Sequence, residues 1–303
     1  MYTLESPAKA VAVSVSAPAK INLSLQVIAR RDDGFHEISS HAVGIGLCDI
    51  VRVRRLNQPQ ITLSCDDPTL AGEDNLAHRA AAALRKSSGY AAGVHIDLLK
   101  RIPVGGGLGG GSSDAAATLR ICNDLWDLNR SAPELTRIGA GLGSDVPLFF
   151  HLPAALMSGR GEHVHPVALR WTGWAALVFV GCHVSTAEVY GAWRPADAHL
   201  RATDLQGQLA AAATANELTP LLYNDLEAAV FRVSPRVAQA HHRLNNAGWG
   251  SWRVSGAGSA LFRLFDDQEE ALTVSTRVER ELSLCTTVVQ APVSMPEIKH
   301  EEN

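Results

Sequence analysis

The sequence predicts a protein that mixes strands and helices and is organised as two domains. Its 303 residues, 46% of them hydrophobic, are enough to form two separate cores. In the first half, an alternating segment (94–98), a glycine-rich loop and an alanine-rich helix follow one another. Glycine, histidine and proline then cluster at residues 159–170, which indicates a domain boundary. We therefore expect domains at residues 1–165 and 166–303.

Composition narrows the class of protein. A net charge of −4 gives no electrostatic reason to expect nucleic acid or a membrane surface as partner. The five cysteines are odd in number and contain no C-x-x-C pair, as expected of reduced thiols in a cytoplasmic protein. The apolar run near the N-terminus is too short for a signal peptide, and no window reaches the length of a membrane span. We expect a monomer or a homodimer.

The remaining elements follow from local patterns. Alternation predicts strands at 13–16, 21–27, 51–53 and 61–63, and the first two precede a turn at 32–34. Helices are predicted at 73–86 and at 132–142, the second N-capped by Ser131 with Pro133 in its first turn. In the second half we expect a buried strand at 175–180, a helix at 226–244 and strand–loop–strand at 252–264. The last six residues are expected to form a solvated tail.

The glycine-rich loop is the most informative segment. It has six glycines in seven positions, followed by two hydroxyls, and its residues are Pro103, Val104, Gly105, Gly106, Gly107, Leu108, Gly109, Gly110, Gly111, Ser112 and Ser113. Few side chains separate a ligand from the backbone here. The amides that open the following helix have no intrahelical partners, and the helix dipole adds positive charge. The loop therefore predicts an anion site, best suited to phosphate.

Two known phosphate-binding loops, and a turn that binds no ligand, are the alternatives for this segment. A Walker A loop places a lysine before its Ser or Thr, but Gly111 precedes Ser112 here, which excludes it. A dinucleotide fingerprint needs a second strand that ends in an acid about 20 residues on, and no such strand is predicted before Asp124 or Asp127. A turn without a ligand would lose much backbone entropy for no evident gain.

The loop resembles the ATP-phosphate loop of the superfamily of galactokinase, homoserine, mevalonate and phosphomevalonate kinases (GHMP kinases). The segment 17–23 resembles the first motif of that superfamily, and 254–262 resembles the third. The resemblance implies an α+β fold with two domains, the first like ribosomal protein S5 domain 2 and the second ferredoxin-like. It also implies ATP as phosphoryl donor, with Mg²⁺, and the loop residues as the cradle for the nucleotide phosphates.

Phosphoryl transfer needs positive charge and a group that accepts the proton of the acceptor hydroxyl. Because the loop has no lysine of its own, Lys20 from the first motif is the candidate for the charge. Asp145, in the glycine-flanked segment 143–147, is the candidate acceptor of the proton. A purely structural ion pair between the two is the alternative. For Asp114, we favour a role as a helix N-terminal charge, and for Ser113 an N-cap role is compatible with ligand binding.

One branch of the superfamily, the 4-diphosphocytidyl-2-C-methyl-D-erythritol kinase family, matches further segments. Residues 31–38 resemble its Arg-x-Asp-Gly-Tyr-His motif, 143–147 its Gly-Ala-Asp-Val-Pro motif, and 184–190 its Val-Ser-Thr-x-x-x-Tyr motif. The resemblance places Asn75 near the adenine, and makes Lys20 and Asp145 the catalytic pair. It implies a cytidine diphosphate substrate that is phosphorylated on its 2-hydroxyl, in the non-mevalonate route to isoprenoids.

A cytosine can be held between two aromatic faces while its edge is hydrogen-bonded. Phe35 and Tyr190 are the candidate faces, His36 is the edge partner, and Asn22 is a further candidate contact with the acceptor. Ordinary packing is the alternative for the two aromatics, and an exposed turn position is the alternative for His36. A mevalonate- or homoserine-type kinase, or a non-catalytic relative that senses a ligand, remain the other functions to consider.

Overall fold

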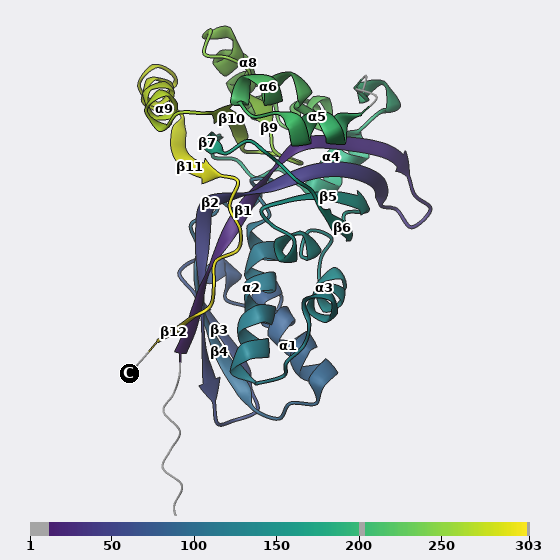
Figure 1. Ribbon diagram of the computed structural model, residues 1–303, viewed down its shortest axis with the longest axis vertical. Coiled ribbons are helices and arrows are strands. Elements are labelled where there is room, and N and C mark those ends of the chain that lie inside the picture. The colour runs from purple at the N-terminus through teal and green to yellow at the C-terminus, as the bar shows by residue number, and fades with distance from the viewer. Residues whose placement is uncertain (1–11, 200–203, 302–303) are drawn as a thin grey trace, which may run out of the picture.

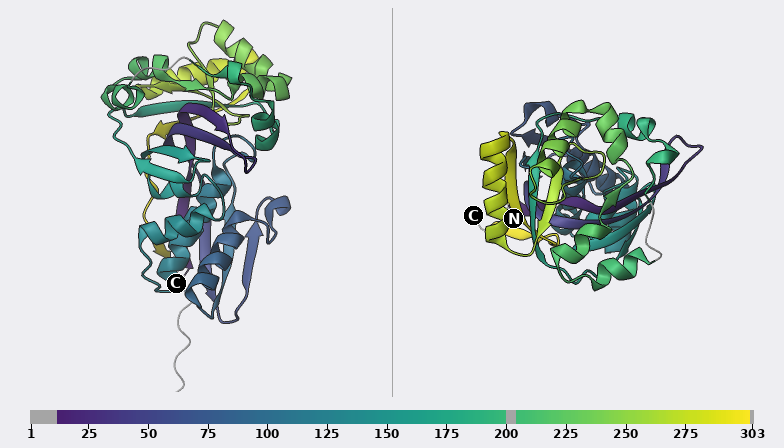
Figure 2. Two further views of the ribbon diagram at one scale, coloured as in Figure 1. Left: turned by 90° about the vertical axis from the view of Figure 1, so that its right-hand side faces the viewer. Right: turned by 90° about the horizontal axis from the view of Figure 1, so that it is seen from above.

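The computed structural model describes residues 12–199 and 204–301, which fold into two sheets with helices packed on them. Figure 1 shows the two long strands β1 (Ala12–Arg30) and β2 (His36–Leu56) running from the lower part of the molecule into the upper part. The helices of the first half cover one face of these strands below. The helices of the second half gather above, with β7, β9 and β10 among them (Figure 1 and Figure 2).

The first sheet has eight strands, and its main path runs β12–β1–β2–β4–β3. Its shorter strands are β3 (Ile61–Cys65), β4 (Gly93–Leu99), β5 (Ala154–Gly159), β6 (His163–Pro166), β8 (Tyr223–Asn224) and β12 (Lys299–Glu301). Alternate residues of β1 and β2, such as Val13 and Val53, are buried against α1 (Leu76–Ser88) and α2 (Gly110–Leu125). The period-2 burial is that of a sheet with helices on one face.

Local signals account for the ends of the first helices. Asn75 caps α1 by accepting a hydrogen bond from the Ala77 amide, and Gly89 ends it with a φ of +70°. The predicted N-cap position of Ser131 is confirmed, because Ser131 directly precedes α3 (Ala132–Ala140). Its amide and its hydroxyl both donate to the Glu134 carboxylate, at 2.9 and 2.8 Å.

The second sheet contains β7 (Gly173–Phe179), β9 (Arg253–Val254), β10 (Leu261–Phe265) and β11 (Cys285–Ala291), in the order β11–β7–β10–β9. The helices between these strands are α4 (Thr186–Ala192), α5 (Leu205–Ala211), α6 (Ala215–Leu218), α7 (Glu227–Val233), α8 (Pro235–Asn246) and α9 (Gln268–Leu282). The paired strands are antiparallel, with α7 and α8 before β9 and α9 before β11. This is the βαββαβ order of a ferredoxin-like domain, as predicted.

Two predicted elements are corrected. The helix expected at 226–244 is two helices, because Ser234 is extended and Pro235, which has no amide hydrogen, opens α8. The last residues are not wholly a solvated tail, because Lys299–Glu301 pair with the start of β1. The side chains of Lys299 and His300 are exposed, as expected, while their backbone pairs with β1. Residues 302–303 lie outside the described residues.

The two sheets pack on each other through a shared core. Ala19 and Ile21 of β1 and Val43 of β2 lie in one cluster with Leu177 of β7 and Phe262 of β10. The boundary expected at 165/166 falls within β6, before the chain enters the second sheet at β7. The later strands β8 and β12 return to the first sheet. The long strands thus carry residues of the first motif up to the second domain.

Candidate active site

The glycine loop ends in a helix whose amide groups are open to a ligand. Gly105, Gly107 and Gly109 have φ values of +70°, +73° and +72°, which favour glycine. α2 begins at Gly110, and its N-cap, Gly109, provides no side-chain cap. The first-turn amides therefore point out of the helix with the positive end of the dipole behind them. Such an arrangement binds phosphate well.

The third motif holds the other side of the loop. The amides of Ser259 and Ala260 donate to the carbonyls of Gly105 and Gly106, each at 3.1 Å, and the Ser255 hydroxyl donates to the Gly107 carbonyl at 3.1 Å. A Cβ on Gly107 would lie 2.1 Å from the Ser255 carbonyl oxygen. The second domain thus occupies the loop carbonyls and leaves its amides for a ligand.

Lys20 reaches this loop from β1. Its amide donates to the Leu108 carbonyl at 2.9 Å, and its side chain, only 4% exposed, lies against Gly109. Its ammonium lies 3.8 Å from an Asp145 carboxylate oxygen. Burial lowers the pKa of Lys20, and the negative charge of Asp145 opposes that effect. Lys20 and Asp145, which were expected to act together, therefore lie next to each other beside the glycine loop.

Asn22 orients the Lys20 ammonium. The Asn22 Oδ1 accepts a hydrogen bond from Lys20 Nζ at 2.6 Å, and its Nδ2 donates to the Ser40 hydroxyl at 2.8 Å. Ser40 in turn donates to the carbonyl of Ser24 at 2.7 Å. Since residues i and i+2 of a strand share a face, β1 presents Lys20 and Asn22 to the same side.

The two serines after the loop differ in their surroundings. Ser112 is half-buried and faces Gly143, close to Asp145 in sequence. Ser113 is fully buried, and its hydroxyl has no hydrogen-bond partner among the described residues. The alternative N-cap role for Ser113 is excluded, because α2 begins three residues earlier, at Gly110, with Gly109 as its N-cap. A buried hydroxyl without a partner is uncommon and fits a site completed by a ligand.

Other predicted nucleotide contacts have local roles. Asn75 uses its side-chain oxygen to cap α1, and its Nδ2 donates to the Leu70 carbonyl at 2.9 Å. Pro103 and Val104 are exposed at the start of the loop, whereas Leu108 is buried beneath it.

The predicted cytosine contacts lie at the far end of the β1–β2 hairpin and on α4. The rings of His36 and Tyr190 lie 5.1 Å apart with a tilt of 32°, and Trp193 meets His36 edge-on at 5.9 Å. Burial raises the pKa of Tyr190 and, with the nearby charge of Arg30, lowers that of His36. Phe35 is 47% exposed. The structure therefore pairs Tyr190 with His36 and leaves Phe35 facing outward.

One buried charge cluster under the glycine loop was missed by the sequence reasoning. The Lys100 ammonium contacts the carboxylates of both Asp49 and Asp114, the latter at 2.7 Å. Asp49 also accepts hydrogen bonds from the amides of Arg101 and Ile102 at 2.6 and 2.8 Å. Burial raises the pKa of Asp114 to about 7, against the opposing charge of Lys100. The expectation that Asp114 acts as a helix N-terminal charge is wrong, because α2 begins at Gly110 and its first turn contains no acidic residue. Asp114 instead belongs to this buried cluster, and only the fold brings it to Asp49.

The raised pKa of Asp114 leads to a prediction for stability. In the folded protein Asp114 keeps its proton up to a pH of about 7, whereas its ordinary pKa is 3.8. Wild-type stability therefore falls, on account of this group, as the pH rises from about 4 to about 7. We expect Asp114→Asn to remove that fall. The free energy of unfolding of the variant, compared with that of wild type, should therefore rise by up to about 4 kcal/mol between pH 4 and pH 8. Urea unfolding at several pH values measures it, and parallel stability curves would contradict it.

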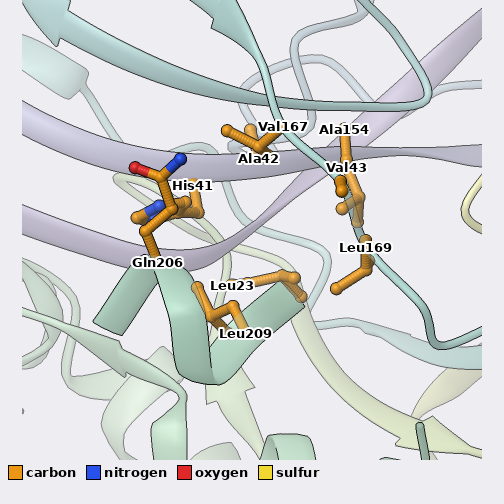
Figure 3. Close-up of a pocket in the computed structure, with 10 residues that line it drawn as sticks. Leu23, His41, Ala42, Val43, Ala154, Val167, Leu169, Gln206 and Leu209 are labelled. Atoms are coloured by element: carbon orange, nitrogen blue, oxygen red, sulfur yellow. The ribbon is translucent and has the colours of Figure 1, made fainter. Parts of the chain in front are cut away.

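Two hollows lie away from this site. Figure 3 shows a cavity between the long strands and α5, lined by apolar residues with His41 and Gln206 at one end. Its volume is about 10 Å³. It has room for about one water molecule. A wider hollow of about 460 Å³ lies over β2, β3 and β4 and includes Arg52 and Asp97. Neither contains any of the residues predicted for the site.

Among the described residues, no group of three or more His, Cys, Asp or Glu side chains comes close enough together to hold a metal ion. None of the helices in the described part of the chain is both long and apolar enough to cross a membrane.

The comparisons with known proteins agree with this geometry. The model of the GHMP kinases N terminal domain matches residues 75–152, and that of the GHMP kinases C terminal matches residues 202–284. A 4-diphosphocytidyl-2-C-methyl-D-erythritol kinase of Shouchella clausii (strain KSM-K16) is 37% identical over 257 residues, which are 84% of this chain and 86% of the relative.

Solved structures show the same likeness. A crystal structure of 4-(cytidine 5'-diphospho)-2C-methyl-D-erythritol kinase is 32% identical with a TM-score of 0.77, and the match covers 91% of this chain and 98% of that one. The homoserine kinase of Cytophaga hutchinsonii ATCC 33406 has a TM-score of 0.74 at 17% identity, over 99% of this chain and 100% of its own. The second likeness is one of fold alone.

Proposed function

Because the chain belongs to the 4-diphosphocytidyl-2-C-methyl-D-erythritol kinase family of the GHMP kinases, we propose that it transfers the γ-phosphoryl group of ATP to the 2-hydroxyl of that cytidine diphosphate compound. The products are the 2-phosphate and ADP, in the non-mevalonate route to isoprenoid precursors. The five free cysteines support a reducing, cytoplasmic compartment.

One observation carries the proposal at the level of chemistry. A buried lysine and a carboxylate, 3.8 Å apart, lie beside the open N-terminus of α2, although they come from positions 20 and 145. A loop that cradles phosphate, a cation that neutralises charge and a carboxylate that accepts a proton are the parts that phosphoryl transfer requires. A purely structural ion pair would not need the glycine loop beside it.

The glycine loop and the first turn of α2 bind the donor. Backbone amides of residues 105–112 face the phosphates, and the Ser112 and Ser113 hydroxyls add polar contacts. Mg²⁺ suits this donor set, since it prefers hard oxygen ligands and takes most of them from phosphates and water. The unpartnered Ser113 hydroxyl is the protein group that best fits its coordination. When bound, Mg²⁺ supplies neutralisation of the charge on the phosphate oxygens.

Lys20 and Asp145 act on the acceptor. Asp145 accepts the proton of the 2-hydroxyl while the hydroxyl oxygen forms its bond to the γ-phosphorus. The bond from that phosphorus to the bridging oxygen of ADP breaks in the same displacement. The Lys20 ammonium, held by Asn22, stabilises the negative charge on the transferring oxygens.

The cytidine end of the substrate binds at the β1–β2 hairpin. Phe35 offers an exposed aromatic face, and His36, packed on Tyr190, offers a ring nitrogen for the base edge. Asn75 caps α1 and so fixes the conformation of the backbone at the start of that helix, which contacts the adenine.

An ADP-release assay tests this function. Purified protein with ATP and Mg²⁺ is offered 4-diphosphocytidyl-2-C-methyl-D-erythritol, mevalonate or homoserine in parallel. We expect turnover with the first alone, and competitive inhibition of it by CDP. Equal or greater turnover with mevalonate or homoserine, or the absence of inhibition by CDP, would assign the chain to another GHMP kinase activity. Absence of ADP release with all three would favour a non-catalytic relative.

A further inference from the structure

Phe35 is an exposed aromatic residue on a rigid turn. Its amide donates to an Asp33 carboxylate oxygen at 3.1 Å, and its carbonyl accepts from the Arg31 amide at 2.8 Å. Arg31 is in turn paired with Asp33 at 3.0 Å and with Glu37 at 2.8 Å. The backbone of the turn is therefore fixed while the ring remains 47% exposed.

Arg160 covers one face of that ring. Its guanidinium carbon lies 5.0 Å from the centroid of the Phe35 ring, within the range of a cation–π contact. Arg160 belongs to the turn between β5 and β6, which lies close to the β1–β2 hairpin because Gly159 pairs with Ile38 of β2 (Figure 1). The two turns thus meet through one arginine and one aromatic ring.

Further contacts hold the arginine in place. Its Nε lies 3.7 Å from a Glu162 carboxylate oxygen, and its Nη2 donates to the Ala140 carbonyl at 3.5 Å. Ala140 is the last residue of α3, where the helix dipole favours a positive charge. A long side chain held by several partners loses little further freedom when a ligand binds to the ring that it supports.

The same turn also touches the loop of Asp145. Gly161 has a φ of +117°, and a Cβ built there would lie 3.5 Å from both the side chain and the carbonyl oxygen of Ser144. The turn 159–162 therefore contacts the base-binding end of the site through Arg160 and the segment of the proton acceptor through Gly161.

We propose that Arg160 is a positioning residue for the acceptor substrate: its guanidinium backs one face of Phe35, so that the opposite face is presented to a pyrimidine base. The inference rests on the proposed cytidine substrate. Arg160 acts through Phe35 and has no part in the transfer itself. Its removal therefore affects the KM of the acceptor and not kcat or the KM of ATP.

Steady-state kinetics of Arg160→Met, Arg160→Lys and Phe35→Leu, with the double variant Phe35→Leu/Arg160→Met, tests the inference. We expect Arg160→Met to raise the acceptor KM and the inhibition constant of CDP about fivefold, the effect of one cation–π contact, and Arg160→Lys to recover part of the loss. In the Phe35→Leu background, Arg160→Met should change the KM within about twofold, because the ring through which it acts is gone.

Arg277 provides the matched control. It lies over the Trp249 ring at 4.9 Å in the second domain, so Arg277→Met removes a similar contact and should leave all kinetic constants unchanged. An unchanged acceptor KM in Arg160→Met, or an undiminished effect in the Phe35→Leu background, overturns the inference. A lower kcat with an unchanged KM also overturns it, because the turn then acts on Asp145. If the wild-type protein does not phosphorylate the cytidine substrate, the proposed function itself fails.

Discussion

Replacing Asp145 by Asn is expected to lower kcat by about 10³-fold, because a positioned general base contributes roughly 10²- to 10⁴-fold. The amide keeps the size of the carboxylate but cannot accept the hydroxyl proton. Donor and acceptor bind elsewhere, at the glycine loop and at the β1–β2 hairpin, so both KM values should stay close to those of wild type. Initial rates over a matrix of ATP and acceptor concentrations separate the two effects.

The alternative for this residue is a structural ion pair with Lys20. In that case Asp145→Asn would lower the melting temperature and leave kcat of the folded fraction intact. Lys20→Met and the double variant complete the test: residues that act as one unit give losses far from additive. Asp197→Asn, which breaks the ion pair with Arg232 in the second domain, is the control and should leave kcat unchanged.

The residues of this site were predictable where their chemical type and local pattern were unusual. Glycines in sequence, a lysine beside an apolar strand and an aspartate without helical register each stand out alone. Asp49 and Lys100 do not, since each resembles an ordinary charge at the end of a strand. Their contact joins positions 51 residues apart, and no local pattern encodes it. The same reason hid the contact of Arg160 with Phe35.

The fold shows a similar division. Alternation predicted two strands, at 13–16 and 21–27, but they form one strand that passes through Pro18. The pairing register with β2 shifts between Pro18 and Ala19, and again between Asn22 and Ser24. Proline is accepted in a sheet at such bulges, and bulges re-aim the side chains next to them. Lys20 lies between the two shifts, so the irregularity that interrupts the sequence pattern also positions the site residue.

Replacing Lys100 by Met is expected to destabilise the protein by about 3 to 5 kcal/mol near pH 8, because it leaves two buried carboxylates without their cation. Asp49 and Asp114 are essentially unexposed, so water cannot solvate them in place of the ammonium. The loss should diminish as the pH falls, since a carboxylate in such a site binds a proton more readily than in the unfolded chain. Urea unfolding at several pH values between about 5 and about 8 measures both the loss of stability and its dependence on pH.

Two further variants test whether the effect comes from the buried charges. Lys86→Met changes an exposed lysine on α1 and should alter stability by no more than about 0.5 kcal/mol. Adding Asp114→Asn to Lys100→Met removes one of the two charges and should restore part of the stability.

The same cluster is connected to the glycine loop, because Asp49 also accepts hydrogen bonds from the amides of Arg101 and Ile102, which lead into that loop. The KM of ATP should therefore rise in Lys100→Met and fall again in the double variant. If Lys100→Met is as stable at pH 8 as the Lys86→Met control, the two buried carboxylates do not need the Lys100 ammonium to compensate their charge. The link between the buried charges and the phosphate loop would then have to be abandoned.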